Sequence, residues 1–152
     1  MTKERSETQF ATLSHITNVR RKITKIIREL ENRKEDHDKS KLYSPEVEIF
    51  DKYSPKLKTL TYGSQEYKDC LKEMGAALNH HYTNNRHHPE YFENGIQGMN
   101  LIDIVEMFCD WLAATERHND GDINKSILLN KERFKYSDDL MMIFKNTIKV
   151  FK

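Results

Sequence analysis

The stretch LIDIVEMFCDWLAATERH, residues 101–118, decides the fold class. Its apolar residues recur at spacings of three and four, which is the period of an α-helix, and they occupy more than one side of it. Ile102 and Val105 lie on one side, while Met107 and Trp111 crowd the other. The pattern predicts a central helix that is buried nearly all round, with Asn100 as its N-terminal cap.

The same helical period continues on both sides of this stretch. Only 5 glycines and 3 prolines interrupt the 152 residues, so the sequence predicts an all-α fold of about six helices in a single domain over residues 1–152. A cap at Ser64 and one at Ser137 mark the starts of two of these helices. We expect helices over about residues 7–35 and 45–54, from 64 to between 84 and 88, and over about 101–118. After a break at 119–122, a helix through Ile127, Leu128 and Phe134 and a last helix after Ser137 should follow.

The first of these helices carries a clear apolar arc. Ile16, Val19, Ile23 and Ile26 fall on one side at 100° per residue, so we expect this side to face the core. His15 lies at the edge of the arc, where an unpartnered imidazole is awkward to bury. The basic residues of the helix point the other way and are interpreted as a solvated face.

Charge and cysteine content narrow the class of protein. The chain has 25 basic and 24 acidic residues, a net charge of +1, which gives no general attraction to nucleic acid. Its apolar runs are far shorter than the ~20 residues that cross a bilayer, and no signal-peptide pattern follows Met1, so we expect a soluble cytoplasmic protein. Cys70 and Cys109 have no CxxC spacing, which argues against a disulfide framework and a thiolate zinc site.

Several histidines and aspartates are placed as a metal site would need them. His37 and Asp38 are adjacent at a helix end, His81 shares a helix face with core residues, and Asp110 lies on the central helix. Each has an ordinary alternative: a surface pair at residues 37–38, a hydrogen-bonded core histidine at 81, and an ion pair of Asp110 with an arginine. Together with His15 they predict one shared site, and mixed N/O ligands suit Mn, Fe, Co, Ni or Zn.

This order of residues resembles the HD-domain superfamily of metal-dependent phosphohydrolases. HITNV at 15–19 is similar to its H-x-x-x-V start, HDKSK at 37–41 to its HD-x-x-K segment, and EMFCDWLA at 106–113 to the helix that bears its last aspartate. The strings HDKSKLYSPE, NHHYTNNRHHPEY and EMFCDWLAATERHNDGD resemble a small branch of HD-like proteins common in bacteria and their phages. The resemblance implies a metal-site core over about residues 10–118, with C-terminal helices over about 122–151 packed on it.

The resemblance also implies a function and roles for the residues. The expected reaction is hydrolysis of a nucleotide or small phosphate ester by metal-activated water, because a bound divalent ion lowers the pKa of water toward ~7. The HD-x-x-K match gives Lys41 a phosphate-facing role, with an ordinary surface lysine as the alternative. The expected metal ligands are His15, His37, Asp38, His81, His88 and Asp110. The expected catalytic residues are Asp38, Lys41, His81 and Glu90, and the residues expected to contact phosphate are Lys41, Arg86 and Arg117.

Three questions stay open at this point. The expected ion is Mn, Fe, Co, Ni, Zn or Mg. The closely spaced histidine pairs at 80–81 and 87–88 allow a second ion beside it. His81, His88 and Glu90 would then bind the second ion, or one of them would act as a general acid. The alternatives to a hydrolase are an HD-like di-iron oxygenase and a non-catalytic, metal-stabilised nucleotide-binding protein. The expected partner is a small phosphorylated molecule, a nucleotide by the resemblance, and we expect no binding to a membrane or to nucleic acid. Whether the protein forms a homodimer is left open by the sequence.

Overall fold

Every regular element in the computed structural model is a helix. The structure describes residues 6–117 and 119–151, and within these ranges it contains no β-strand. The all-α prediction is therefore confirmed, with seven α-helices in the described chain where about six were expected. No helix of the described ranges combines the length and the apolar character needed to cross a membrane.

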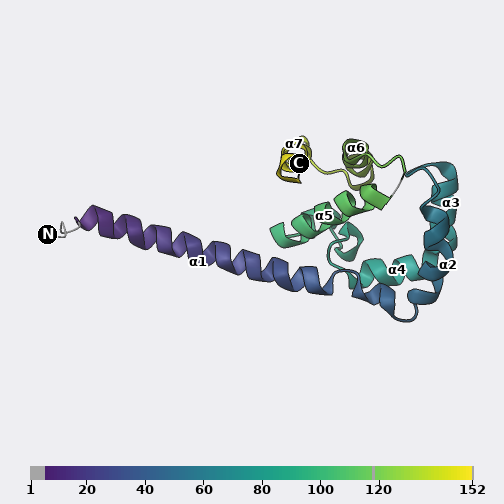
Figure 1. Cartoon of the computed structure of the whole chain (residues 1–152), viewed down its shortest axis with the longest axis horizontal. Helices are drawn as coiled ribbons and strands as arrows, with labels where there is room; N and C mark the ends of the chain where they lie inside the picture. Colours follow the sequence, from purple (N-terminus) through teal and green to yellow (C-terminus); the bar gives the residue numbers. More distant parts are fainter. Residues whose placement is uncertain (1–5, 118, 152) are drawn as a thin grey trace. The chain divides into compact units, whose positions relative to one another are not determined.

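The helices follow one another with short connections (Figure 1). Four of them are brief 3-10 segments, labelled η, which link or extend the α-helices. In order, the elements are α1 (Glu7–Asp36), η1 (Lys39–Leu42), α2 (Val47–Leu57), α3 (Gln65–Glu73), α4 (Gly75–Asn84), η2 (Pro89–Tyr91), η3 (Gly95–Gly98), α5 (Leu101–Arg117), α6 (Ile123–Phe134), α7 (Asp138–Thr147) and η4 (Ile148–Phe151).

The chain divides into two compact units, Met1–Asp36 and His37–Lys152. The first contains α1 and the second contains all the other helices. The predicted single domain over residues 1–152, with a metal-site core at 10–118, therefore stays a prediction.

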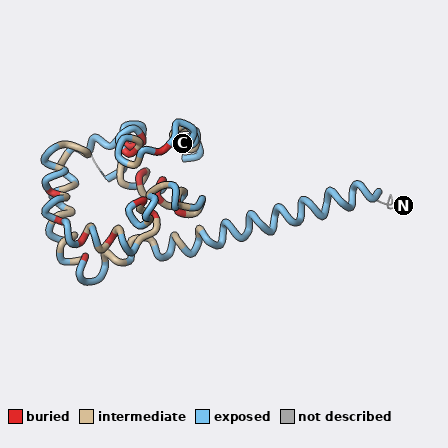
Figure 2. The backbone as a smooth tube through the Cα atoms, turned by 180° about the vertical axis from the view of Figure 1, so that it is seen from behind, coloured by how far each residue is buried: buried red, intermediate tan, exposed pale blue. Residues whose placement is uncertain are grey.

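The first unit contains one unbroken helix, as the period of its sequence predicted. Its apolar arc, however, does not face a core. None of the residues in α1 is buried, and Ile23 is 53% exposed. Figure 2 shows α1 in the colour of exposed residues along nearly its whole length. Within its own unit the arc is therefore exposed, and its packing inside the protein stays a prediction, because the period of a helix fixes which residues share a side but not what covers that side.

The core of the second unit lies where α5, α6 and α7 meet. The rings of Phe108 on α5 and Phe144 on α7 stack with their centroids 4.8 Å apart, and Trp111 lies edge-on to Phe144 at 5.4 Å. Such aromatic pairs add to the stabilisation that comes from burial itself. The buried residues of this core are Met107, Phe108, Trp111, Ile127, Tyr136, Phe144 and Ile148.

Only one side of α5 is buried, although its sequence predicts burial nearly all round. Met107 and Trp111 face α6 and α7, whereas Val105 and Cys109 are exposed. The physical reason is that the described neighbours cover a single side of the helix. Residue 118, which the prediction included in this helix, lies outside the described residues.

The helix starts agree well with the capping signals in the sequence. The Ser64 hydroxyl accepts a hydrogen bond from the Tyr67 amide, and Ser137 caps α7 in the same way. The Asn100 side chain accepts from the amides of Ile102 and Asp103 at the start of α5. Capping of this kind satisfies amides that have no partner inside the helix.

Two boundaries differ from the prediction. The helix expected from 64 to between 84 and 88 is two helices, since Met74 ends α3 and begins α4 with φ −81° and ψ 0°. α2 runs to Leu57 through Pro55 instead of ending near residue 54. The break after α3 matters for the site, because α4 is the helix that carries His81.

Candidate metal centre

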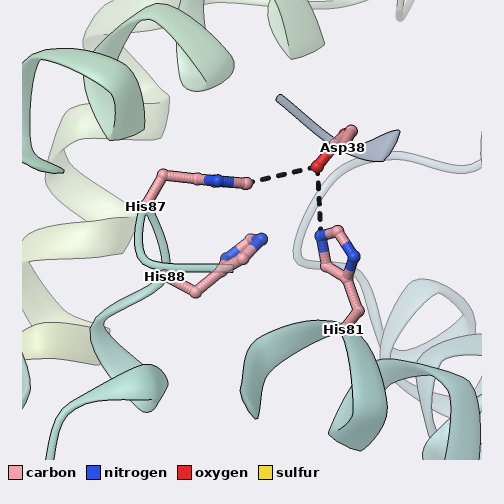
Figure 3. A group of neighbouring side chains, drawn as sticks. All are labelled: Asp38, His81, His87 and His88. Carbon is pink, nitrogen blue, oxygen red and sulfur yellow. Dashed lines mark ion pairs between the residues drawn. The ribbon is translucent and has the colours of Figure 1, made fainter. Parts of the chain in front are cut away.

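Four side chains of the second unit point toward one another (Figure 3): Asp38, His81, His87 and His88. Each offers one ligand atom, and these atoms all lie within 4.8 Å of one another. Oδ1 of Asp38 is 3.2 Å from Nε2 of His81 and 3.4 Å from Nε2 of His87. We call this set the four-ligand cluster.

Three segments of the chain bring the cluster together. Asp38 follows the end of α1 and has a left-handed backbone, with φ 57° and ψ 11°, which non-glycine residues adopt rarely and mostly at turns and functional sites. His81 projects from the last turns of α4. His87 and His88 lie between α4 and η2, and Pro89 restricts His88 to an extended backbone, with φ −99° and ψ 127°.

The ligand atoms of the cluster lack hydrogen-bond partners. In the described part of the chain, four buried side-chain nitrogen or oxygen atoms have no partner: Oδ1 of Asp38 and Nε2 of His81, His87 and His88. Leaving a buried polar atom unsatisfied costs about 1–3 kcal/mol, so native proteins rarely do it without a reason. Four such atoms that converge on one point fit a bound cation, which would satisfy all of them at once.

The other ring nitrogen of His81 shows which atom is free to bind. Its Nδ1 lies 2.9 Å from Oε2 of Glu46, a carboxylate that is 0% exposed. A carboxylate can only accept a hydrogen bond, so Nδ1 carries a proton and Nε2 is the ring nitrogen that faces the cluster. Glu46 also accepts hydrogen bonds from Ser40 and His80. This carboxylate–histidine arrangement is the usual support of a histidine that binds a metal.

A second carboxylate plays the same part on the other side of the cluster. Oε1 of Glu106 lies 3.1 Å from Nδ1 of His87 and 2.9 Å from Nδ1 of His37. Glu106 is one turn before Asp110 on α5, so that helix places both carboxylates beside the histidines. Two of the three histidines in the cluster are therefore oriented by buried or nearly buried acidic side chains.

The electrostatics keep two of the four ligands in the form that binds a metal. Burial alone would raise the pKa of Asp38, but His81, His87 and Lys41 outweigh it and hold that pKa well below its usual range. For His88, burial and the neighbouring His87 and His81 lower the pKa to about 2. Asp38 is thus a carboxylate and His88 a neutral imidazole at physiological pH, as metal binding requires.

The donor set indicates the class of ion. Three imidazole nitrogens and one carboxylate oxygen suit Zn, Fe, Co, Ni or Mn, whereas Mg and Ca prefer sites made of oxygen atoms. The prediction of divalent-metal ligands in this region is supported to that extent: the structure contains buried side chains that can hold such an ion. Mg is the member of the predicted set that fits these donors least well.

A second group shares Asp38. Its other oxygen, Oδ2, lies 3.5 Å from Nε2 of His37, and that same nitrogen lies 3.7 Å from Oδ1 of Asp110. These three residues also form a possible metal group. The Nζ atom of Lys41, however, is only 2.6 Å from Oδ2 of Asp38. A positive charge already stands at this oxygen, so the four-ligand cluster is the better site for one ion.

A cavity of about 570 Å³ adjoins the cluster. His81, His88, Lys41 and Asp110 line it close to the ligands, and the rest of its wall comes from α2 to α6 and the segments between them. The aromatic lining includes Tyr62, Tyr67, Tyr82, Trp111 and Phe134, and the polar lining includes Asn130 and Arg133. This volume lies in the range of pockets that hold small organic molecules.

The sequence pattern of a family of unknown function, DUF5662, matches residues 4–150, nearly the whole chain. The chain belongs to this family. No curated protein and no solved structure matches it. The family therefore supports no particular reaction, and the chemistry has to be argued from the side chains themselves.

The structure brings most of the predicted site residues together. His37, Asp38 and Asp110 form one group, and Asp38 with His81 and His88 makes up most of the four-ligand cluster. Lys41 stands beside Asp38 and lines the cavity, and its phosphate-facing role stays a prediction. Arg117 is exposed at the end of α5 and also lines the cavity, so its contact with phosphate stays a prediction.

Three predicted residues are neither part of these groups nor on the wall of the cavity. His15 is exposed on α1, nearly six turns before Asp36, which is about 30 Å along an unbroken helix. Arg86 makes two hydrogen bonds to the buried carboxylate of Asp103, at 3.1 and 3.0 Å. Glu90 accepts a hydrogen bond from Arg133. Arg86 and Glu90 thus have structural partners where the sequence predicted phosphate and catalytic contacts.

Sequence reasoning missed three residues of the centre: His87, Glu46 and Glu106. His87 is in a non-helical turn, so no period predicts the direction of its side chain, although its pairing with His88 was visible. Glu106 had a signal, because it lies four residues before Asp110 and therefore on the same side of the helix. For Glu46 the sequence offers no comparable signal.

Proposed function

We propose that this protein is a metal-dependent phosphohydrolase that acts on a phosphate ester of nucleotide size. The observation that carries the proposal is the convergence of four unsatisfied, buried ligand atoms beside a cavity that Lys41 also lines. The resemblance to HD-domain phosphohydrolases at His37-Asp38, Lys41 and Asp110 supports it, because these residues lie together at the same place.

Metal ions at such sites polarise a phosphate oxygen and activate water for attack on phosphorus. The residues of this chain would do the rest. Asp38, His81, His87 and His88 would hold the ion, and Glu46 and Glu106 fix the orientation of two of the imidazoles. Lys41 would neutralise charge that develops on the phosphoryl oxygens. Asp110 lines the cavity beside His37 and can accept a hydrogen bond from a water molecule there.

The walls of the cavity support a substrate with an aromatic group, such as a nucleotide. The rings of Tyr62 and Tyr67 lie 5.2 Å apart, and the Tyr62 hydroxyl donates to Oδ1 of Asn130 at 3.4 Å. Tyr82 connects this region with the cluster, since its ring lies 4.7 Å from that of His88. Phosphate at the cluster would therefore leave the remainder of the molecule among aromatic side chains, which favours a flat ring.

The first test is metal analysis of the purified protein together with a hydrolysis screen. We expect close to one equivalent of a transition metal per chain, loss of activity after chelation, and recovery when Mn, Co or Zn is restored. Asp38→Asn preserves the shape of the ligand but removes its charge, and it should abolish both the bound metal and the activity. Asp69→Asn, the same change on an exposed part of α3, is the matched control. A metal-loaded protein that hydrolyses no phosphomonoester, phosphodiester or nucleotide would contradict the proposal.

A second test separates binding of the ion from catalysis. Lys41→Met should leave the metal content unchanged but lower the rate of hydrolysis roughly 100-fold, the usual loss when one group that stabilises transition-state charge is removed. If Lys41→Met keeps full activity, the lysine is a surface residue and its contact with Asp38 has no catalytic role.

Asp38 is shared by two possible metal groups, and this observation favours a second candidate function. A carboxylate that bridges two irons is typical of oxygen-activating sites, and a di-iron oxygenase would need His37 and Asp110 as further ligands. Iron close to two equivalents per chain, with consumption of oxygen in the presence of a small substrate, would favour this function. One equivalent of metal and no oxygen consumption would favour hydrolysis.

A further inference from the structure

Helix α1 forms a unit by itself and presents an exposed stripe of aliphatic side chains. Seven of its large apolar residues are exposed by a third or more: Phe10, Leu13, Ile16, Val19, Ile23, Ile26 and Ile27. Isolated helices are marginal in water, because most of the stability of a helix comes from packing of its apolar side. A helix of 30 residues with no buried residue therefore needs a partner.

The spacing of the stripe indicates what kind of partner fits. Ile16, Val19, Ile23, Ile26 and Leu30 follow one another at intervals of three, four, three and four residues. This is the pattern of the a and d positions of a coiled coil, which is narrower than the broad apolar face of a helix that lies on a membrane. Such a seam is complementary to another seam of the same kind, and α1 itself provides one.

Charges beside the stripe favour pairing of identical helices in parallel. With Ile16 and Ile23 at a positions, Glu29 takes a g position and Lys34 the e position that follows. In a parallel pair, Glu29 of one copy faces Lys34 of the other, and the symmetry of the pair makes this attraction twice. Among the described residues, Lys34 forms an ion pair with the adjacent Glu35, and both side chains are at least 70% exposed.

We propose that α1 self-associates with α1 of a second copy of this chain as a parallel coiled coil through Ile16, Val19, Ile23, Ile26 and Leu30. The assembly buries the stripe and joins copies of the protein through a unit that is separate from the metal centre. Isoleucine and valine at both a and d positions favour more than two strands, so the seam is compatible with a dimer or a trimer.

Light scattering coupled to gel filtration tests the proposal with the full chain. The wild-type mass should be at least twice the 18.1 kDa of one chain. Ile23→Asp places a charge in the middle of the seam and should return the mass to that of a monomer. Asn18→Asp adds the same charge on the opposite side of α1 and should leave the oligomer intact. A monomeric wild type, or an Ile23→Asp variant that remains associated, would overturn the proposal.

A cross-linking experiment tests the parallel register independently. Cys109 is exposed, so Cys109→Ser is the starting background. Adding Ile16→Cys places one thiol at an a position near one end of the seam, where parallel helices bring the two copies face to face and oxidation gives a covalent dimer. In an antiparallel pair, residue 16 would instead lie opposite residue 30, about 21 Å along the helix from its counterpart. Asn18→Cys should not cross-link under the same conditions. If Asn18→Cys cross-links as well as Ile16→Cys, or if neither does, the parallel seam is excluded.

Discussion

The four-ligand cluster and helix α1 each contain side chains without partners, but of opposite kinds. At Asp38 and its three histidines, polar atoms are buried and have no hydrogen bond. Along α1, aliphatic side chains are exposed, and none of the described residues of this helix is buried. Both arrangements cost free energy: about 1–3 kcal/mol for each unsatisfied buried polar atom, and about 1.5–3 kcal/mol of lost stabilisation for each aliphatic side chain left in water. Each region therefore indicates a missing component, a cation in one case and an apolar surface in the other.

The largest expected difference is between the packed core and α1. Phe144 is 2% exposed and stacks on Phe108, whereas Phe10 on α1 is 62% exposed. Phe144→Ala should lower the free energy of unfolding by about 3–5 kcal/mol, because it leaves a cavity in the core. Phe10→Ala, the same change, should alter it by no more than about 0.5 kcal/mol. Chemical denaturation followed by circular dichroism measures both, and similar losses at the two positions would show that α1 has a packed partner at residue 10.

The next effect concerns the ion. A metal that binds the folded protein at 100 times its dissociation constant adds about 2.7 kcal/mol to the free energy of unfolding. Adding Zn or Mn to chelated protein should therefore raise the melting temperature, and Asp38→Asn should remove this response. Helix α1 should contribute nothing to this rise in melting temperature, because its only histidine is His15. If the ions fail to raise the melting temperature of the wild type, the unsatisfied atoms of the cluster do not form a metal site.

How much of this could be predicted depends on whether a residue lies in a regular helix. The period of the sequence placed α1 and α5 correctly and identified His81 as facing inward, because a helix fixes the direction of every side chain along it. It could not place His87, which lies in an irregular turn. The period of the sequence also could not show that the arc of α1 is exposed, or that one side of α5 is exposed. Burial depends on the neighbours that a segment meets after folding.

The supporting carboxylates give a smaller but more specific test. Glu46→Gln keeps the shape of the side chain but removes the charge that holds the proton on Nδ1 of His81. Loss of such a supporting group typically weakens metal binding 10–100-fold, so we expect a change of that size in a competition assay with a chelating dye. Glu48→Gln, on an exposed part of α2, is the matched control. Unchanged affinity in Glu46→Gln would mean that packing alone orients His81.

The smallest effect is expected at His15, and it separates the two regions most directly. In the HD-domain resemblance this residue is the first metal ligand, but in the structure it lies about 30 Å before the end of an unbroken helix. His15→Ala should therefore leave the metal content and the response of the melting temperature to metal unchanged, whereas His88→Ala, the same change within the four-ligand cluster, should reduce both. If His15→Ala loses the ion, then α1 does not act as a separate unit in solution. It would have to bend within one chain or reach the centre of another copy, and the oligomeric state of the variant would tell these two cases apart.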